Sequence, residues 1–145
     1  MKLIADTFLW MRPGLQAAAV LQALIALINL RLVRIMRWKQ DVTNMPLLIR
    51  EVFHVHRWFI SVTVAIFAVM TWRFAADMAL GTNLVARWLA AAIGIFWGLR
   101  TILQVIYYSS SHWRGQPART LVHGILLIVY GGMTLIYLKS GLLPG

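Results

Sequence analysis

Apolar residues in this chain fall into four long, nearly uninterrupted runs that are separated by short polar connections. The runs cover roughly residues 15–35, 52–74, 84–108 and 121–138. A helix rises about 1.5 Å per residue and the hydrocarbon core of a bilayer is about 30 Å thick, so a run of ~20 apolar residues can cross it. The pattern therefore predicts an all-α fold, an integral membrane four-helix bundle with short loops.

The predicted helices occupy most of the chain and leave no room for a separate soluble domain, so we expect residues 1–145 to form a single transmembrane domain. The composition agrees, since 61% of the residues are hydrophobic, 12% are charged and the mean hydropathy is +0.75. A soluble domain carries about 25% charged residues. Residues 1–11 are predicted to form a short interfacial segment, because Arg12-Pro13-Gly14 interrupts the pattern after them.

The net charge of +10 raises the question of nucleic-acid binding. We reject it, because the basic residues lie at the ends of apolar runs, where they orient the chain and contact anionic lipid headgroups. Nine Lys and Arg residues fall in or beside the first and third connections, against five on the opposite side. This asymmetry predicts a bacterial-type inner membrane protein with both termini outside and the 31–57 and 109–120 connections in the cytoplasm.

Small residues form ridges on the predicted helices. Ala90, Gly94 and Gly98 follow one another at intervals of four, and Gly131-Gly132 lies near the middle of the last run. In lipid, helices associate through close packing and interhelical hydrogen bonds, and small residues let their backbones approach. Such ridges serve contacts within the bundle and contacts with other membrane subunits or a second copy alike.

Three of the four histidines, His54, His56 and His123, are candidate cofactor ligands, and the alternative is that the histidines simply lie at the membrane interface. His54 and His56 lie near the start of the second run, His123 lies just inside the fourth, and His112 lies in the connection before it. One b-type haem between the second and fourth runs would use His54 or His56 together with His123 as iron ligands, since helix bundles hold haem between facing helices. His54 and His56 point ~200° apart, so at most one of them faces His123. A pigment or a quinone is a variant of this site.

Arg100 lies about two turns inside the third run, where a charged side chain costs roughly 2.5–3.5 kcal/mol on insertion scales. Gln104 follows one turn later on the same face, which is predicted to lie nearly opposite Gly94 and Gly98. Glu51 at the start of the second run is the expected partner, so that Arg100, Glu51 and Gln104 form a structural polar group. Alternatively, Arg100 reaches lipid phosphate alone, or binds an anionic ligand such as a haem propionate or a quinone carbonyl.

Several kinds of catalysis are excluded or disfavoured. The chain contains no cysteine, which excludes disulfides, thiolate metal sites and thiol catalysis. Ser111 and His112 are adjacent, and neighbouring side chains rarely converge as a nucleophile–base pair. The chain therefore shows no pattern typical of an enzyme.

Two functions remain open. The favoured interpretation is a small non-catalytic integral membrane protein without a cofactor, an accessory, scaffold or assembly subunit that contacts lipids and other membrane subunits or a second copy. The alternative is a redox or cofactor module that binds one b-type haem, a pigment or a quinone near the cytoplasmic side through His54 or His56 and His123, with Arg100 close by.

Overall fold

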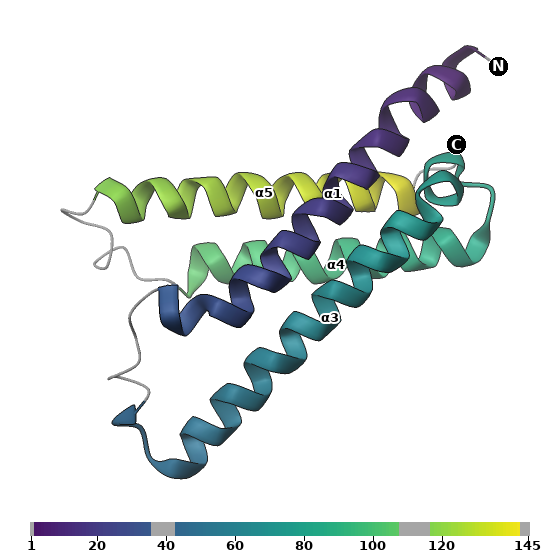
Figure 1. Ribbon diagram of the computed structural model, residues 1–145. Coiled ribbons are helices and arrows are strands. Elements are labelled where there is room, and N and C mark those ends of the chain that lie inside the picture. Colours follow the sequence, from purple (N-terminus) through teal and green to yellow (C-terminus); the bar gives the residue numbers. More distant parts are fainter. Residues whose placement is uncertain (1, 36–42, 108–116, 143–145) are drawn as a thin grey trace. The chain divides into compact units, whose positions relative to one another are not determined.

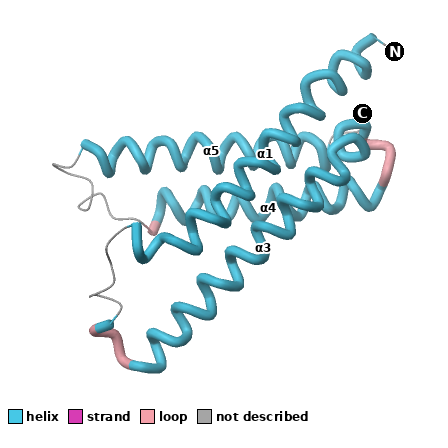
Figure 2. The backbone as a smooth tube through the Cα atoms, in the orientation of Figure 1, coloured by secondary structure: helices cyan, strands magenta, loops and turns pink. Residues whose placement is uncertain are grey.

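The fold consists of long helices and the turns that join them. The computed structural model describes residues 2–35, 43–107 and 117–142, with side chains from residue 9 to 31, 43 to 107 and 120 to 142 (Figure 1). The long helices are α1 (Lys2–Ile35), α3 (Leu47–Leu80), α4 (Leu84–Ile106) and α5 (Pro117–Leu142). No strand occurs in these ranges (Figure 2). The predicted all-α class with four helices is confirmed.

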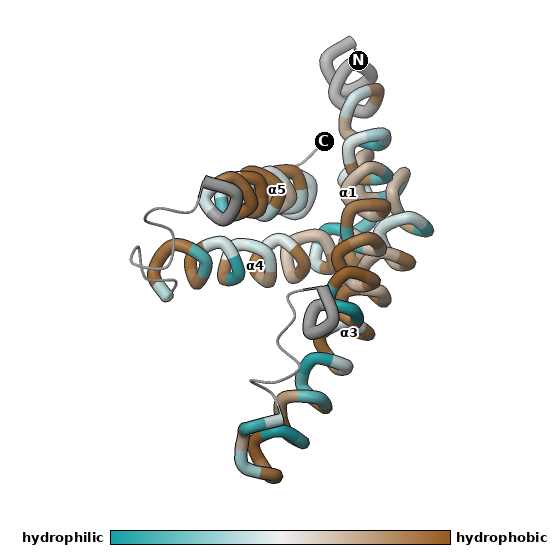
Figure 3. Tube along the Cα trace, turned by 60° about the vertical axis from the view of Figure 1, so that its left-hand side comes forward, coloured by the Kyte–Doolittle hydropathy of each residue, from teal (hydrophilic) through white to brown (hydrophobic). Residues whose placement is uncertain are grey.

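All four helices are long and apolar enough to cross a membrane. Their apolar segments are Leu9–Arg31, Leu47–Leu80, Leu84–Ile106 and Thr120–Leu142. Apolar residues follow one another along most of α5 in Figure 3. Because each segment reaches the ~20 residues that a bilayer requires, the chain is an integral membrane protein.

The beginning of α1 differs from the expectation. The helix runs from Lys2 through Pro13 without a break, whereas the sequence predicted a separate interfacial segment in residues 1–11. Proline removes one backbone hydrogen bond, but transmembrane helices tolerate it because neighbouring groups satisfy the carbonyl that it leaves open. The prediction of a break at Arg12-Pro13-Gly14 was therefore wrong.

A tight turn joins α3 to α4. Gly81 ends α3 with a positive φ of 66°, and its N–H donates to the carbonyl of Asp77 at 3.1 Å. Glycine adopts this left-handed conformation at little cost, which makes it the usual residue after a helix. Asn83 then caps α4, since its side-chain oxygen accepts from the N–H of Val85 at 2.9 Å and of Ala86 at 3.2 Å. The two caps explain why the connection is so short.

The chain forms two compact units. One unit comprises Met1–Leu15 with Phe74–Gly145, and the other comprises Gln16–Arg73. The division falls within α1 and within α3, so both helices contribute to both units. The single domain expected for residues 1–145 stays a prediction.

In the unit Gln16–Arg73, a polar contact joins α1 to α3. The side-chain nitrogen of Asn29 donates to the hydroxyl of Ser61 at 2.8 Å and to the carbonyl of Arg57 at 3.3 Å. The Ser61 hydroxyl in turn donates to the same carbonyl at 2.9 Å. An interhelical hydrogen bond of this kind contributes about 0.6 kcal/mol on average in a membrane. About two turns before Asn29, Gln22 is fully buried and its amide has no hydrogen-bond partner among the described residues.

In the other unit, α4 and α5 pack closely against each other. A Cβ atom added at Gly94 would lie 3.0 Å from the backbone nitrogen of Leu138, and one added at Gly98 would lie 3.3 Å from a methyl carbon of Thr134. The missing side chains thus let the two helices approach. The predicted small-residue ridge on α4 is confirmed as a packing surface, and α5 occupies it.

Candidate functional site

Polar and aromatic side chains line the contact between α4 and α5 in a row that we call the polar strip. Its members are Trp97, Arg100 and Gln104 of α4 and His123 and Tyr130 of α5. Residues three, four or seven positions apart share one face of a helix, which explains how α4 presents its three members together. All five belong to the same compact unit, Met1–Leu15 with Phe74–Gly145.

Gln104 and His123 form a direct hydrogen bond between the two helices. The distance from Nε2 of Gln104 to Nδ1 of His123 is 2.9 Å, and Gln104 is 2% exposed. Oε1 of Gln104 has no partner among the described residues. The amide nitrogen donates to Nδ1 and thereby selects the tautomer with its proton on Nε2. A turned amide, with Oε1 accepting from Nδ1–H, would select the tautomer whose Nε2 can bind a metal.

Arg100 lies over an aromatic ring of the same unit. Its Cζ atom is 5.2 Å from the centre of the Tyr130 ring, and Tyr130 stacks on Trp97 with 5.2 Å between ring centres and 28° between ring planes. A cation–π contact is worth about 2 kcal/mol when it is desolvated. The contact therefore offsets much of the cost of placing a guanidinium inside a transmembrane helix.

The structure corrects one expectation about the faces of α4. Arg100 and Gln104 were expected nearly opposite Gly94 and Gly98, yet both pairs contact α5. At about 100° per residue, Gln104 lies only ~80° from Gly94 around the helix, and the long side chain of Arg100 bridges the remaining angle. Sequence reasoning also missed Trp97 and Tyr130, although Trp97 lies three residues before Arg100 and the spacing could have indicated a shared face.

The remaining predicted site residues lie on α3 in the unit Gln16–Arg73. His54, His56 and Glu51 are all exposed, and the His54 ring contacts Phe53 edge-on at 5.8 Å. His123 and Arg100 belong to the other unit. The haem ligation by His54 or His56 with His123 and the pairing of Arg100 with Glu51 stay predictions.

Metal-ligating side chains do not gather in the part of the chain that the structure describes. No group of three or more His, Cys, Asp or Glu side chains there is arranged to hold a metal ion. His112 lies outside the described residues. A haem iron held by two histidines needs no such group, so this finding bears only on metal sites with three or more protein ligands.

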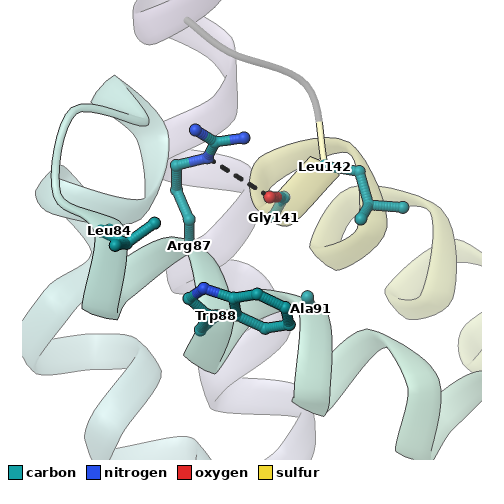
Figure 4. A pocket seen from close by; sticks show the side chains of 6 residues that line it. All are labelled: Leu84, Arg87, Trp88, Ala91, Gly141 and Leu142. Atoms are coloured by element: carbon teal, nitrogen blue, oxygen red, sulfur yellow. Dashed lines mark hydrogen bonds between the residues drawn. The ribbon is translucent and has the colours of Figure 1, made fainter.

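A small cavity opens where the beginning of α4 meets the end of α5 (Figure 4). Its volume is about 180 Å³, and its walls are Leu84, Arg87, Trp88, Ala91, Gly141 and Leu142. Nε of Arg87 donates to the carbonyl oxygen of Gly141 at 3.4 Å. Sequence reasoning counted Arg87 only as a charge that orients the chain, because nothing in the sequence brings it next to residue 141.

Comparison with known proteins gives no relative. No family model matches the chain, and neither the curated proteins nor the solved structures show a significant match. The residues and their geometry are therefore the only guide to function.

Proposed function

We propose that the protein is a small non-catalytic integral membrane subunit, an accessory, scaffold or assembly component of a larger membrane complex. The observation that carries this proposal is a glycine face on α5. A Cβ atom added at Gly124, Gly131 or Gly132 would meet nothing within 4 Å. Gly124 and Gly131 are seven residues apart and share a face of the helix. Small residues in that position let the backbone of another transmembrane helix approach.

The surroundings of the glycine face support a helix as its partner. Ile128 and Leu135 lie beside the glycines and are 77% and 73% exposed. Large apolar side chains next to glycines form the ridges and grooves that helices use for packing in lipid. On α4, Gly94 and Gly98 lie against α5, so the glycines of α4 are already used for packing within the chain.

The proposal includes the membrane in which the protein lies and its orientation there. The chain lies in a bacterial-type inner membrane with both termini outside and with the 31–57 and 109–120 connections in the cytoplasm, where the basic residues contact anionic headgroups. The distribution of Lys and Arg along the sequence supports this orientation. A tag at either end that is accessible only from outside would agree with it, and a tag accessible only from the cytoplasm would contradict it.

Substituting Gly131 with leucine tests the subunit proposal. After mild solubilisation and affinity purification, the native protein is expected to bring a stoichiometric partner or a second copy of itself. Gly131→Leu places a large side chain on the glycine face and is expected to reduce the bound partner about tenfold, which corresponds to about 1.4 kcal/mol of packing free energy. Ala92→Leu adds a leucine at an exposed position of α4 and is expected to keep the partner. A native protein that always runs alone as a monomer would refute the proposal.

A second candidate function is supported by the hydrogen bond between Gln104 and His123. We propose as the alternative a redox or cofactor module in which one b-type haem is ligated by His123 and by His54 or His56, with Arg100 close to a propionate. Histidines that ligate metals are held through their other ring nitrogen by a neighbouring polar group. Gln104 occupies that position at Nδ1 of His123, and with its amide turned, so that Oε1 accepts from Nδ1–H, it would leave Nε2 free to bind iron. A quinone or a pigment would use the same residues.

The visible spectrum of the purified protein, oxidised and then reduced with dithionite, decides between the two functions. If haem is present, His123→Ala is expected to abolish the reduced α-band, and Gln104→Leu is expected to lower haem occupancy about tenfold because it frees the ring. His112→Ala is the matched control and should leave the band unchanged. A colourless native protein, or a band that survives His123→Ala, would rule out the haem module.

A further inference from the structure

Arg87 stands where a negative charge would be stabilised. It lies in the first turn of α4, which begins at Leu84 and contains no acidic residue in that turn. The N-terminus of a helix carries a partial positive charge, so an anion is favoured there and a cation is not. An arginine in this place adds to the positive potential instead of cancelling it.

The guanidinium of Arg87 is held in place but only partly used. Its Nε donates to the carbonyl of Gly141, one of the last carbonyls of α5, which have no partner within their own helix. Among the described residues its two terminal nitrogens have no partner. An arginine presents its donors in a planar fork that matches phosphate and carboxylate oxygens.

Most backbone N–H groups at this end of α4 already have partners, and that of Arg87 donates to the carbonyl of Asn83. Asn83 accepts from Val85 and Ala86, so the start of the helix offers few open donors of its own. An anion at this place would therefore be bound by the side chain of Arg87 and not by a helix N-terminus alone. This assigns the recognition to one residue that can be substituted.

The cavity beside Arg87 is mostly apolar. Arg87, Trp88 and Leu84 line it from α4, and Leu142 lines it from α5 (Figure 4). Trp88 is 71% exposed, and tryptophans at the ends of transmembrane helices lie at the level of the lipid headgroups. A ligand that fits both parts of the site has an anionic group for Arg87 and an apolar stem for the cavity.

We propose that this cavity binds a phospholipid, with its phosphate on the guanidinium of Arg87 and its glycerol and upper acyl chain against Trp88 and Leu142. Inorganic phosphate shares the anionic chemistry but has nothing to place in the cavity. The site is separate from the glycine face and from the polar strip, so its test does not depend on either proposed function.

The test uses native mass spectrometry of the full chain released from mild detergent, with three probes. Phosphatidylglycerol supplies phosphate and acyl chains, diacylglycerol supplies acyl chains alone, and inorganic phosphate supplies the anion alone. We expect one retained phosphatidylglycerol, no retained diacylglycerol, and no displacement by phosphate. Arg87→Gln is expected to weaken lipid retention about tenfold or more, as the loss of a charge-assisted hydrogen bond implies.

Lys139→Gln is the matched control. Lys139 lies two residues before Gly141, its Nζ is 4.2 Å from the centre of the Trp10 ring, and it does not line the cavity. The substitution removes the same charge near the same end of α5 and should leave lipid retention within about twofold. An equal loss of lipid retention in Arg87→Gln and Lys139→Gln would show that the lipid responds only to the overall positive charge, and it would overturn the proposal.

The other outcomes are equally decisive. Retention of diacylglycerol would mean that the cavity binds acyl chains without recognising phosphate. Displacement of the lipid by inorganic phosphate would mean that the site binds the free anion. Either result would overturn the proposal of a phospholipid site. If Arg87→Gln does not fold, a fluorescence experiment takes its place. Brominated phosphatidylglycerol is added to the native protein and to Trp88→Phe, and the quenching of tryptophan fluorescence is compared. Bromine quenching is expected to be clearly smaller in Trp88→Phe, and equal quenching would overturn the proposal.

Discussion

Replacing Trp97 with alanine is expected to lower the free energy of unfolding by about 3 kcal/mol. Trp97 is 2% exposed and is the largest of the fully buried side chains among the residues that the structure describes. Its ring stacks on Tyr130, which in turn lies under the guanidinium of Arg100. Alanine would remove the stacking, leave a cavity between α4 and α5 and deprive Tyr130 of one of its supports. Lipid cannot refill a space that is enclosed by protein, so the lost dispersion contacts are not replaced.

The measurement is unfolding in mixed micelles with increasing SDS, followed by far-UV circular dichroism. Trp97→Phe is the matched control, because it keeps an aromatic ring that can stack on Tyr130, although it is smaller than the indole, and it removes Nε1, which has no hydrogen-bond partner among the described residues. We expect this variant to cost under about 1.5 kcal/mol, since an unpaired buried donor is itself unfavourable. Equal destabilisation in both variants would show that the ring contact with Tyr130 is not what stabilises this helix pair.

The class of the protein could be predicted from the sequence because one physical constraint dominates it. A backbone that crosses lipid must satisfy its own hydrogen bonds, and a helix of about 20 apolar residues is the simplest solution. The four apolar runs therefore indicated four helices, and the spacing of Gly94 and Gly98 indicated a packing ridge. Both features depend only on local periodicity, which a sequence displays directly.

Contacts between helices were predicted less well. The sequence suggested Glu51 as the partner of Arg100 because a carboxylate is the usual counter-ion, and that pairing stays a prediction. It gave no indication of the Tyr130 ring, over which the guanidinium of Arg100 lies in the structure. Likewise, the pairing of Gln104 with His123 depends on the crossing of α4 and α5. Such pairings are decided by how far one helix is shifted along another, and single-chain periodicity does not contain that shift.

The ends of the helices were also predictable only in part. Gly81 and Asn83 are strong local signals, and both act as caps in the structure. Pro13 is an equally strong local signal for a break, yet α1 continues through it. The difference lies in the surroundings, since a proline within a membrane segment is tolerated when neighbouring groups satisfy the open carbonyl. A local rule derived from soluble helices overstated the effect of this proline.

Substituting Gly141 with alanine is expected to destabilise the protein by about 1–3 kcal/mol. A Cβ atom at Gly141 would lie 2.6 Å from the backbone nitrogen of Ala91 and 2.8 Å from its Cα. Backbone atoms cannot turn away as a flexible side chain can, so α5 must shift as a whole at this end. The shift would also move the carbonyl that accepts the hydrogen bond from Arg87.

Gly131→Ala is the matched control, because a methyl group added there meets nothing within 4 Å. Alanine favours the helical conformation over glycine by about 1 kcal/mol in a helix interior, so the control is expected to be neutral or slightly stabilising. The same exchange in the same helix should thus have opposite signs at the two positions in SDS unfolding. If both variants unfold like the native protein, α5 does not approach α4 at Gly141 as closely as its backbone indicates, and the support for Arg87 at the cavity is lost with it.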